Sequence, residues 1–481
     1  MFAKLTALVG GYSFPYELQE TLPHPWGQWT HYRGVHKEDG SVASVFKVSA
    51  VDPNDKKLVV ARNGVRRLKM LRHPNILAFK DSAEVQEKGA TVIYLVTQPV
   101  RSLKTVLEEL DLQGQHRDEY LAMGILHITN AVSFLNNDCK LIHGNICMDA
   151  VVVTDTLDWK LHGFDLLSEH ALPPDHCLAH GTWLVGSQYK PAEVNRGGWD
   201  VVAQSPPWAV DAWGLGCFMQ EAFSRQYLQS VENLRQTDCI PQALLGDYQK
   251  LLSSTPSRRL NPAKVAECKF LNNRLVGLVA FLENISVKDL FEKESFFKRL
   301  TGVLEAIPSA VLIQKVLPLL SHALEFGGAP PHAISPLLQI GNTLDSHEFN
   351  KRVVPTLSKL FASPDRTVRK NLLESIDTYV QNLTTQTIEE QIFVHLQDSF
   401  PPAKIAGLRA MVATAQYHSA EDAALRILPA VSPLAVEPVG EVRGATLQVL
   451  DCFTTKLKEA DAQRARRVLK KKQMRNAPHN Y

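Results

Sequence analysis

Two short stretches decide the fold of this chain: Leu141-Ile142-His143-Gly144-Asn145 and Trp159-Lys160-Leu161-His162-Gly163-Phe164-Asp165. Each joins an apolar, strand-like run to a turn. Working outward, other short segments accompany them in a fixed order along the chain. These are Leu71–Leu77, Val92–Thr97 followed by Gln98-Pro99, Gly186–Glu193, Val210–Cys217 and Pro256–Arg259. Each segment alone is a weak signal, whereas the ordered set over about one domain length is a strong one.

The ordered set resembles the motifs of a protein kinase. Leu71–Leu77 matches the turn after the small-lobe helix, and Val92–Thr97 the strand that leads to the hinge between the lobes. Gly186–Glu193 matches the end of an activation segment, with Pro-Ala-Glu in place of Ala-Pro-Glu. The resemblance implies an α+β fold with a two-lobed kinase-like domain at residues 12–265. The small lobe reaches to about residue 98, and the large lobe spans 99–265.

The positions that would carry phosphoryl transfer hold other residues. The reaction needs metal held by acidic and amide oxygens, a lysine on the phosphates and a carboxylate for the substrate hydroxyl. Asn145 stands in place of that carboxylate, and a neutral amide cannot accept the proton. The lysine, helix glutamate, amide ligand and aspartate ligand are replaced by Phe46, Gly64, Ala150 and Gly163. We therefore expect a pseudokinase that binds neither ATP nor Mg²⁺.

A rearranged active site is the alternative. Asp165 lies two residues from the missing metal ligand, Asp149 is near the missing amide, and Lys47 follows Phe46 directly. A shift of one residue in a strand points the side chain to the opposite face, so Lys47 would face away from the pocket. An active atypical kinase would need three such relocations and a new base. We favour a pocket filled by side chains such as Phe46.

The retained kinase positions share a structural role. The resemblance implies that Glu193 pairs with Arg259, partly buried, and that Asp211 holds the backbone of the loop that contains His143. Removing one partner of a buried pair leaves an uncompensated charge, which costs about 3–5 kcal/mol. These residues maintain a shape whether or not the domain catalyses a reaction.

Composition is that of an ordinary globular protein of 481 residues, with 45% hydrophobic residues, 21% charged residues and a net charge of +2. Its seven scattered cysteines fit reduced thiols in cytosol or nucleus. No apolar run is long enough to span a membrane. His170, His176, Cys177 and His180 could suggest metal, but a structural zinc site has four ligands with paired spacing. We interpret them as solvated loop histidines and expect no metal site.

After Arg259 the pattern changes to a 3.6-residue period. Helical faces are read at Val353, Val354, Leu357, Leu360 and Phe361, and at Leu372, Leu373, Ile376, Val380 and Leu383. Val368, Ile405 and Val442 recur at intervals of 37 residues at the start of second helices, and a Leu/Val-Pro pair recurs in first helices at 317–318, 354–355 and 428–429. This period predicts HEAT-like repeats at 311–460, after a helical connector at 266–310. A plain helical bundle is the alternative.

The C-terminal segment 461–481 is strongly basic. Seven cations occur within twelve residues without an acid: Arg464, Arg466, Arg467, Lys470, Lys471, Lys472 and Arg475. Such a run can bind RNA phosphates, an anionic membrane or an acidic protein surface. It can equally be the solvated end of the last repeat.

A degenerate kinase domain followed by HEAT repeats and a charged tail resembles the Scy-like pseudokinases, over nearly the whole chain. Phrases such as Phe14-Pro15-Tyr16-Glu17-Leu18, Lys315-Val316-Leu317-Pro318 and Phe326-Gly327 carry the match. The resemblance implies a scaffold in Golgi-to-ER traffic that associates with the COPI coat (coatomer) and small GTPase machinery, or an adaptor in nuclear tRNA export. It implies a cytoplasmic protein at the Golgi or ER–Golgi intermediate compartment, with the nucleus as an alternative and with peripheral membrane association.

The chain departs from that family in two ways. The repeat array is short, as though units were missing between about Gln397 and Lys404. Pro478–Tyr481 do not match the short basic coat-binding end of that family, so the internal basic run is the candidate substitute.

Overall fold

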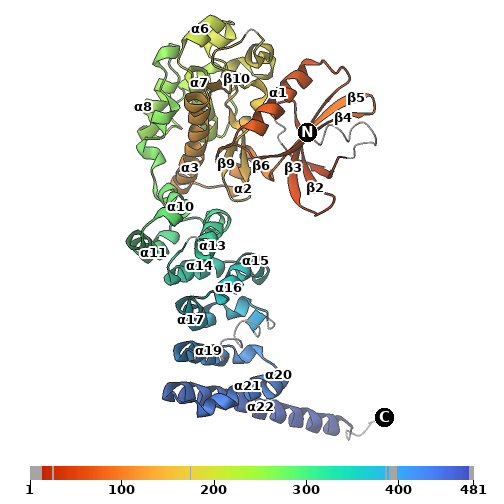
Figure 1. Cartoon of the computed structure of the whole chain (residues 1–481), viewed down its shortest axis with the longest axis vertical. Helices are drawn as coiled ribbons and strands as arrows, with labels where there is room; N and C mark the ends of the chain where they lie inside the picture. The colour runs from red at the N-terminus through yellow and green to blue at the C-terminus, as the bar shows by residue number, and fades with distance from the viewer. Residues whose placement is uncertain are drawn as a thin grey trace, which may run out of the picture. The chain divides into compact units, whose positions relative to one another are not determined.

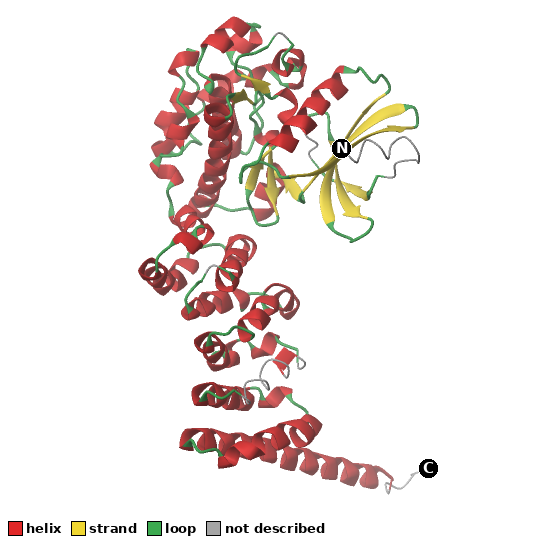
Figure 2. Ribbon diagram, in the orientation of Figure 1, coloured by secondary structure: helices red, strands yellow, loops and turns green. Residues whose placement is uncertain are grey.

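A computed structural model describes residues 14–23, 27–173, 175–326, 328–384, 387–388 and 398–475, with side chains up to residue 469 in the last helix. The chain divides into two compact units, Met1–Ala280 and Phe281–Tyr481. Figures 1 and 2 show that the described strands all belong to the first unit, whereas the second is helical. The α+β fold with a helical array is thereby confirmed, and the division falls inside the predicted connector 266–310.

The first unit begins with an antiparallel five-stranded sheet in the order β1-β2-β3-β5-β4. Its strands are β1 Tyr16–Thr21, β2 Thr30–His36, β3 Val42–Ala50, β4 Phe79–Glu87 and β5 Ala90–Thr97. The connection from β3 to β4 contains helix α1, Lys56–Met70, which begins where the Asp55 side chain accepts a hydrogen bond from the backbone of Lys57. The sheet and α1 form the small lobe.

The remainder of the first unit is mostly helical. Its longest helices are α2 Leu103–Leu110, α3 Gly114–Ser133, α7 Ala209–Ser224 and α8 Gln242–Leu251, and α10 Arg274–Glu283 crosses the division. Short helices are α4 Cys177–His180, α5 Ala192–Asn195, α6 Trp199–Gln204 and α9 Pro262–Val265. Two small sheets complete the lobe. One has the strand order β6-β8-β9, with β6 Val100–Ser102, β8 Val151–Thr154 and β9 Trp159–Leu161, and the other pairs β7 Leu141–Ile142 with β10 Ser168–Glu169.

The core of the large lobe forms where α3 meets β9. The Trp159 side chain is fully buried, and its indole nitrogen donates to the hydroxyl of Tyr120 at 3.0 Å. A Cβ atom at Gly124 would lie 2.1 Å from the Trp159 ring. Only glycine allows the helix to approach the indole this closely, and the strand that leads to Gly163 is held in place by this contact.

The second unit is a succession of helices that pack on their neighbours. In chain order they are α11 Leu290–Leu304, α12 Ser309–Val311, α13 Leu317–Glu325, α14 Ile334–Gly341, α15 Ser346–Arg352, α16 Val354–Phe361, α17 Arg366–Glu374, α19 Pro401–Ala413, α20 Ala420–Asp422, α21 Leu428–Val431 and α22 Gly440–Arg475. Helix α13 contacts α14 and α16, α16 contacts α17, and α17 contacts α19, which contacts α22. Val368, Ile405 and Val442 lie near the starts of α17, α19 and α22, as the 37-residue period predicts.

The recurring proline has a structural consequence in the first helices. A wide π-type turn at Leu312–Val316 precedes Leu317-Pro318, and a second one at Ala423–Ile427 precedes Leu428-Pro429. Proline lacks an N–H and its ring displaces the carbonyl four residues back, so the regular α-helical ladder is interrupted there. The recurring Leu-Pro pair therefore marks a π-type turn at the same place in both helices.

The predicted helical face from Leu372 to Leu383 is wrong in part. Helix α17 ends at Glu374, and Ile376–Thr378 and Val380–Asn382 form 3₁₀ turns instead of continuing it. The Tyr379 hydroxyl donates to Leu372 O, a carbonyl at the end of the helix, at 2.9 Å. Asn371 O accepts hydrogen bonds from both the backbone N–H of Ser375 at 3.1 Å and its hydroxyl at 2.9 Å. The apolar side chains of Ile376 and Val380 are still buried. Gln397, where the predicted gap in the array begins, lies outside the described residues.

Candidate functional site

The cleft between the small-lobe sheet and the large lobe is the first candidate site. In β3, Phe46 is paired with Leu95 of β5 and is buried on the cleft side, stacked on the His31 ring with 4.4 Å between centroids. Lys47 points to the other face, where its Nζ lies 3.3 Å from Glu87 Oε2 and 5.2 Å from the centre of the Tyr94 ring. A phenyl ring thus occupies the place of the phosphate-binding lysine, and the neighbouring lysine is held outside.

Helix α1 approaches the opposite wall of the cleft too closely for a glutamate. A Cβ atom at Gly64 would lie 2.2 Å from Asp165 Oδ1. The preceding residue, Asn63, donates from Nδ2 to Asp165 O at 3.0 Å and to Leu167 O at 3.1 Å. The helix is therefore fastened to the turn that follows Gly163, and Asp165 fills the space where a longer side chain would stand.

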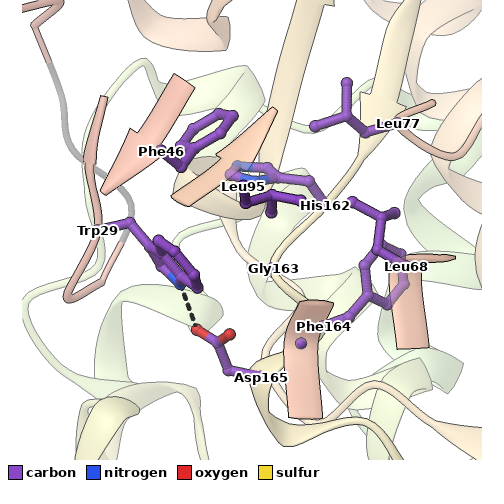
Figure 3. Close-up of a pocket in the computed structure, with 10 residues that line it drawn as sticks. Trp29, Phe46, Leu68, Leu77, Leu95, His162, Gly163, Phe164 and Asp165 are labelled. Carbon is purple, nitrogen blue, oxygen red and sulfur yellow. Dashed lines mark hydrogen bonds between the residues drawn. The ribbon is translucent and has the colours of Figure 1, made fainter. Parts of the chain in front are cut away.

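Asp165 also receives a hydrogen bond from Trp29, the residue that precedes β2. The indole nitrogen of Trp29 donates to Asp165 Oδ2 at 2.9 Å, as Figure 3 shows. Burial raises the pKa of Asp165 to about 8, against the opposing effect of the Trp29 hydrogen bond. At neutral pH this carboxyl group is mostly protonated, so it is a poor ligand for Mg²⁺.

Little space is left around Phe46 and Asp165. The cavity there has a volume of about 20 Å³, which is room for about one water molecule, whereas a separate hollow of about 330 Å³ lies between the sheet and the connection between the lobes. The lining of the smaller cavity comprises Trp29, Phe46, Gly64, Leu68, Leu77, Leu95, His162, Gly163, Phe164 and Asp165 (Figure 3). Burial lowers the pKa of His162 to about 3 and that of His31 to about 4, so both imidazoles are neutral at pH 7. The groups around Phe46 and Asp165 do not fit the phosphates of a nucleotide with their metal.

A second set of contacts, which sequence reasoning missed, lies at the connection between the lobes, beside the hollow of about 330 Å³. Ser44 Oγ accepts a hydrogen bond from the backbone N–H of Val100 at 3.0 Å and donates to the carbonyl of the same residue at 3.2 Å. His31 Nε2 lies 2.8 Å from the same hydroxyl. The backbone polar groups of Val100, which a flat heterocycle could otherwise address, are thus already satisfied.

The catalytic-loop positions are equally unsuited to phosphoryl transfer. Asn145 Oδ1 lies 3.7 Å from Cys147 Sγ, Ala150 is fully buried, and Gly163 adopts a left-handed conformation with φ of +80°. Asp149 accepts a hydrogen bond from Tyr227 Oη at 2.7 Å. The three residues of the rearranged-site alternative, Lys47, Asp149 and Asp165, are each engaged in separate contacts and are not brought together.

The retained positions form a buried network in the large lobe. Asp211 accepts hydrogen bonds from the backbone N–H groups of His143 at 2.7 Å and Gly144 at 2.8 Å, and from Asn136 Nδ2 at 2.7 Å. His143 Nε2 donates to the carbonyl of His162 at 2.9 Å. The loop that contains Asn145 is therefore held by its backbone, independently of the side chain at that position.

The second part of this network is the ion pair between Glu193 and Arg259. Arg259 Nη1 lies 2.5 Å from Glu193 Oε1, and Nη2 lies 3.0 Å from Oε2. Nη1 also donates to Ala209 O at 2.8 Å, and both side chains are almost fully buried. The bidentate geometry satisfies both carboxylate oxygens, which a buried ion pair requires to be stable.

The interpretation of the activation-segment histidines as solvated is wrong for His176. This side chain is buried, accepts a hydrogen bond from Ala179 N at 3.1 Å at the start of α4, and meets the Trp199 ring edge-on. His170 Nε2 lies 2.8 Å from Ser205 O, and His180 lies 3.8 Å from Asp175. Nowhere in the described part of the chain do His, Cys, Asp and Glu side chains form a group that could hold a metal ion.

The basic segment continues the last helix. Arg464, Arg466 and Arg467 are exposed on α22, which runs without a break to Arg475. Lys470, Lys471, Lys472 and Arg475 lie outside the residues whose side chains are described. In the described ranges, none of the helices is both long enough and apolar enough to cross a bilayer.

No protein-family model matches the chain. It is 37% identical over 395 residues to the "Probable inactive serine/threonine-protein kinase scy1" of Dictyostelium discoideum, across 82% of this chain and 47% of that protein. It is 24% identical over 410 residues to the "Protein kinase-like protein SCY1" of Saccharomyces cerevisiae, across 75% and 49% respectively. The chain spans about half the length of these relatives.

Two further matches widen the comparison. The mouse "Protein-associating with the carboxyl-terminal domain of ezrin" is 27% identical over 379 residues, across 75% of this chain and 49% of that protein. Among solved structures, Cex1p matches 93% of this chain and 82% of its own with a TM-score of 0.58 and 17% identity. At that identity the structural match shows a shared fold and nothing about activity.

Proposed function

The chain belongs to the Scy1-like family of inactive, kinase-like proteins, and from this premise we propose that it is a non-catalytic scaffold in vesicle traffic between the Golgi and the ER, associated with the COPI coat. The observation that supports the scaffold role best is the filled cleft. Phe46 and Asp165 occupy the space that the phosphates of a nucleotide and their metal would need.

The second unit supplies the surfaces that a scaffold needs. Stacked helix pairs bury one face against each other and leave long faces exposed, which suit protein partners better than small substrates. Coatomer and small GTPase machinery are the partners that the family resemblance favours. The proposal includes a cytoplasmic protein that associates peripherally with Golgi or ER–Golgi intermediate membranes.

We propose in addition that the cleft binds neither ATP nor Mg²⁺. Isothermal titration calorimetry of the purified chain with ATP and MgCl₂ tests this, and the expected result is no saturable heat up to millimolar concentration. Saturable binding that Phe46→Ala changes would contradict the proposal, because it would place the nucleotide in the cleft.

A second candidate function is an RNA-transport adaptor that carries tRNA out of the nucleus. The observation that favours it is the basic end of α22, where Arg464, Arg466 and Arg467 are exposed. Phosphate contacts by such side chains weaken as salt rises, because counterions are released on binding. Binding of tRNA that falls steeply with salt and is lost when these arginines become glutamine would support this candidate.

Affinity purification of the tagged chain from its native cells, with and without ribonuclease, separates the two functions. A matched variant carries glutamine at Arg464, Arg466 and Arg467. Coatomer subunits that survive ribonuclease support the trafficking scaffold. Recovery dominated by tRNA and export factors, and lost both on ribonuclease treatment and in the glutamine variant, would replace it by the adaptor.

A further inference from the structure

Helix α1 is strongly basic. Its sequence contains no carboxylate and has basic side chains at Lys56, Lys57, Arg62, Arg66, Arg67 and Lys69. Ion pairs neutralise two of them: Arg62 lies 2.7 Å from Glu84, and Arg67 lies 2.6 Å from Glu169. In the described part of the chain, no carboxylate lies within 4 Å of the charged nitrogens of the other four. A net positive strip therefore remains on the surface of α1.

The neighbours of these four cations leave their charge in place. Arg66 Nη2 donates to the neutral amide oxygen of Asn63 at 3.0 Å. Lys56 Nζ lies 4.7 Å from the centre of the Trp183 ring, and Lys69 Nζ lies 5.8 Å from that of Phe79. Aromatic rings and amides orient a cation without cancelling its field at a distance.

Apolar side chains are exposed along the same strip. Val59 is 46% exposed and Met70 is 73% exposed, while Trp183 on the adjoining segment is 39% exposed. Val59, Arg66 and Met70 follow one another at intervals of seven and four residues, which places them on one side of a helix. We call the surface formed by Lys56, Val59, Arg66, Lys69, Met70 and Trp183 the α1 outer face.

The inner side of α1 fixes this face in position. Leu58 and Leu68 are buried, and Asn63 is hydrogen-bonded to the backbone at Asp165 and Leu167. A helix held in this way keeps its outer side chains on a rigid base, so a partner does not have to order it on binding.

We propose that the α1 outer face is a docking surface for an acidic segment of a partner protein. Carboxylates of that segment would meet Arg66, Lys69 and Lys56, and one or two of its apolar side chains would pack on Val59 and Met70. Those two positions lie about 16 Å apart along the helix at 1.5 Å per residue, a length that three helical turns of a partner match.

Charge at the edges of the strip favours a protein segment over a membrane. Glu84 and Glu169 lie beside α1 through their ion pairs with Arg62 and Arg67, and both carboxylates are partly exposed. Each places a negative charge directly beside the cations of α1. An anionic bilayer would bring its charge against these glutamates as well, whereas a narrow acidic segment can contact Arg66, Lys69 and Lys56 without covering them.

This inference rests on the proposed scaffold function, and the test keeps the two apart. A photo-crosslinking residue, p-benzoylphenylalanine, replaces Val59 or Met70 in the tagged full-length chain in its native cells. Val201 in α6, which is 50% exposed, is the control position. The expected result is a protein adduct at 59 and 70, absent at 201, whose crosslinked peptide is rich in Asp and Glu.

A synthetic copy of the crosslinked peptide is then titrated against the purified chain by fluorescence anisotropy. Lys56→Glu with Lys69→Glu is expected to weaken binding at least tenfold, while Lys264→Glu with Lys298→Glu, two exposed lysines elsewhere, leaves it unchanged. Among the described residues, the ammonium groups of both lysines in the first variant lie over aromatic rings and form no ion pair or hydrogen bond, so the fold is expected to survive. Equal binding by both variants would overturn the proposal.

Other outcomes are decisive as well. Adducts no stronger than at position 201, crosslinked peptides without acidic residues, or binding of the chain to phosphatidylserine vesicles that the Lys56/Lys69 variant abolishes would each overturn it. Recovery of coatomer by the Lys56/Lys69 variant would show that the scaffold function stands without this face. If the tagged wild-type chain recovers no protein partner at all, the scaffold proposal itself has failed.

Discussion

The cleft around Phe46 and Asp165 and the network around Asp211 and Arg259 are both buried in the same unit, yet they are built from opposite kinds of groups. In the cleft, neutral histidines, aromatic rings and a protonated carboxyl group fill the space. In the network, ionised side chains are fully paired. Polar groups that hold the backbone were kept, and polar groups that would only serve a ligand were replaced by packing.

This difference shows which parts of a fold depend on the reaction. Asp211 binds two backbone N–H groups, and its loss would expose unsatisfied donors whatever the protein does. A buried lysine at position 46 without phosphate would instead be an unpaired charge, so an aromatic ring there is the more stable choice. The predictions below test this contrast, beginning with the largest expected effect.

Replacing Arg259 by methionine should be the most destabilising change, with a loss of about 3–5 kcal/mol in the free energy of unfolding, because Glu193 is left buried and unpaired. All seven tryptophans of the chain lie in the first unit, so urea unfolding followed by tryptophan fluorescence reports on that unit. Adding Glu193→Leu should restore part of the loss. A double variant as unstable as the single one would mean that packing, and not the stranded carboxylate, accounts for the effect.

Replacing Gly64 by alanine tests how tightly the cleft is filled. The new Cβ would meet Asp165 Oδ1, and we expect a loss of about 1–3 kcal/mol from overpacking. Gly246 in α8 is the matched control, because nothing lies within 4 Å of its Cβ position. Gly246→Ala should gain up to about 1 kcal/mol from helix propensity. Equal changes in the free energy of unfolding for the two variants would show that the cleft can accommodate an additional methyl group.

The carboxyl group of Asp165 should make the first unit less stable as pH rises. Its folded-state pKa is raised from 3.8 to about 8, so between these values the folded chain holds a proton that the unfolded chain has released. Stability then falls with pH in that window by up to about 1.4 kcal/mol per unit, and levels off above pH 8.

Asp165→Asn should remove this dependence while keeping an acceptor for Trp29. The quantity to measure is the difference in unfolding free energy between wild type and variant at pH 5.5, 7 and 8.5, since the titration of His31 and His162 cancels in that difference. A difference that does not change with pH would show that Asp165 is ionised in the folded chain.

Lys47→Ala should have the smallest effect, below about 1 kcal/mol, because the ion pair with Glu87 is partly exposed on the outer face of the sheet. In a working kinase the lysine of this strand is essential. A small effect here would therefore show that Lys47 has no corresponding role in this chain. A thermal shift assay suffices to measure it. A large loss of stability would indicate that the outer face contributes more to the fold than the cleft.

Much of this arrangement follows from motif order and strand alternation. The positions of Phe46 and Lys47 on opposite faces and the two-lobed fold were predicted in this way. The hydrogen bonds of Ser44 with Val100 and of Trp29 with Asp165 were not predicted. They join residues 56 and 136 positions apart, and no local sequence pattern encodes such a contact. The end of α17 was missed because the apolar period continues past Glu374, and the hydrogen bond of the Tyr379 hydroxyl to Leu372 O is not visible in that period.

The hydrogen bond between Trp29 and Asp165 also gives the molecule a built-in optical probe. The indole is buried, and its N–H faces a carboxyl group whose ionisation changes the local field. Any separation of the lobes would move this ring into water and shift its emission to longer wavelength. A difference spectrum between wild type and Trp29→Phe would isolate that signal from the other tryptophans, so opening of the cleft by a partner can be followed without a label.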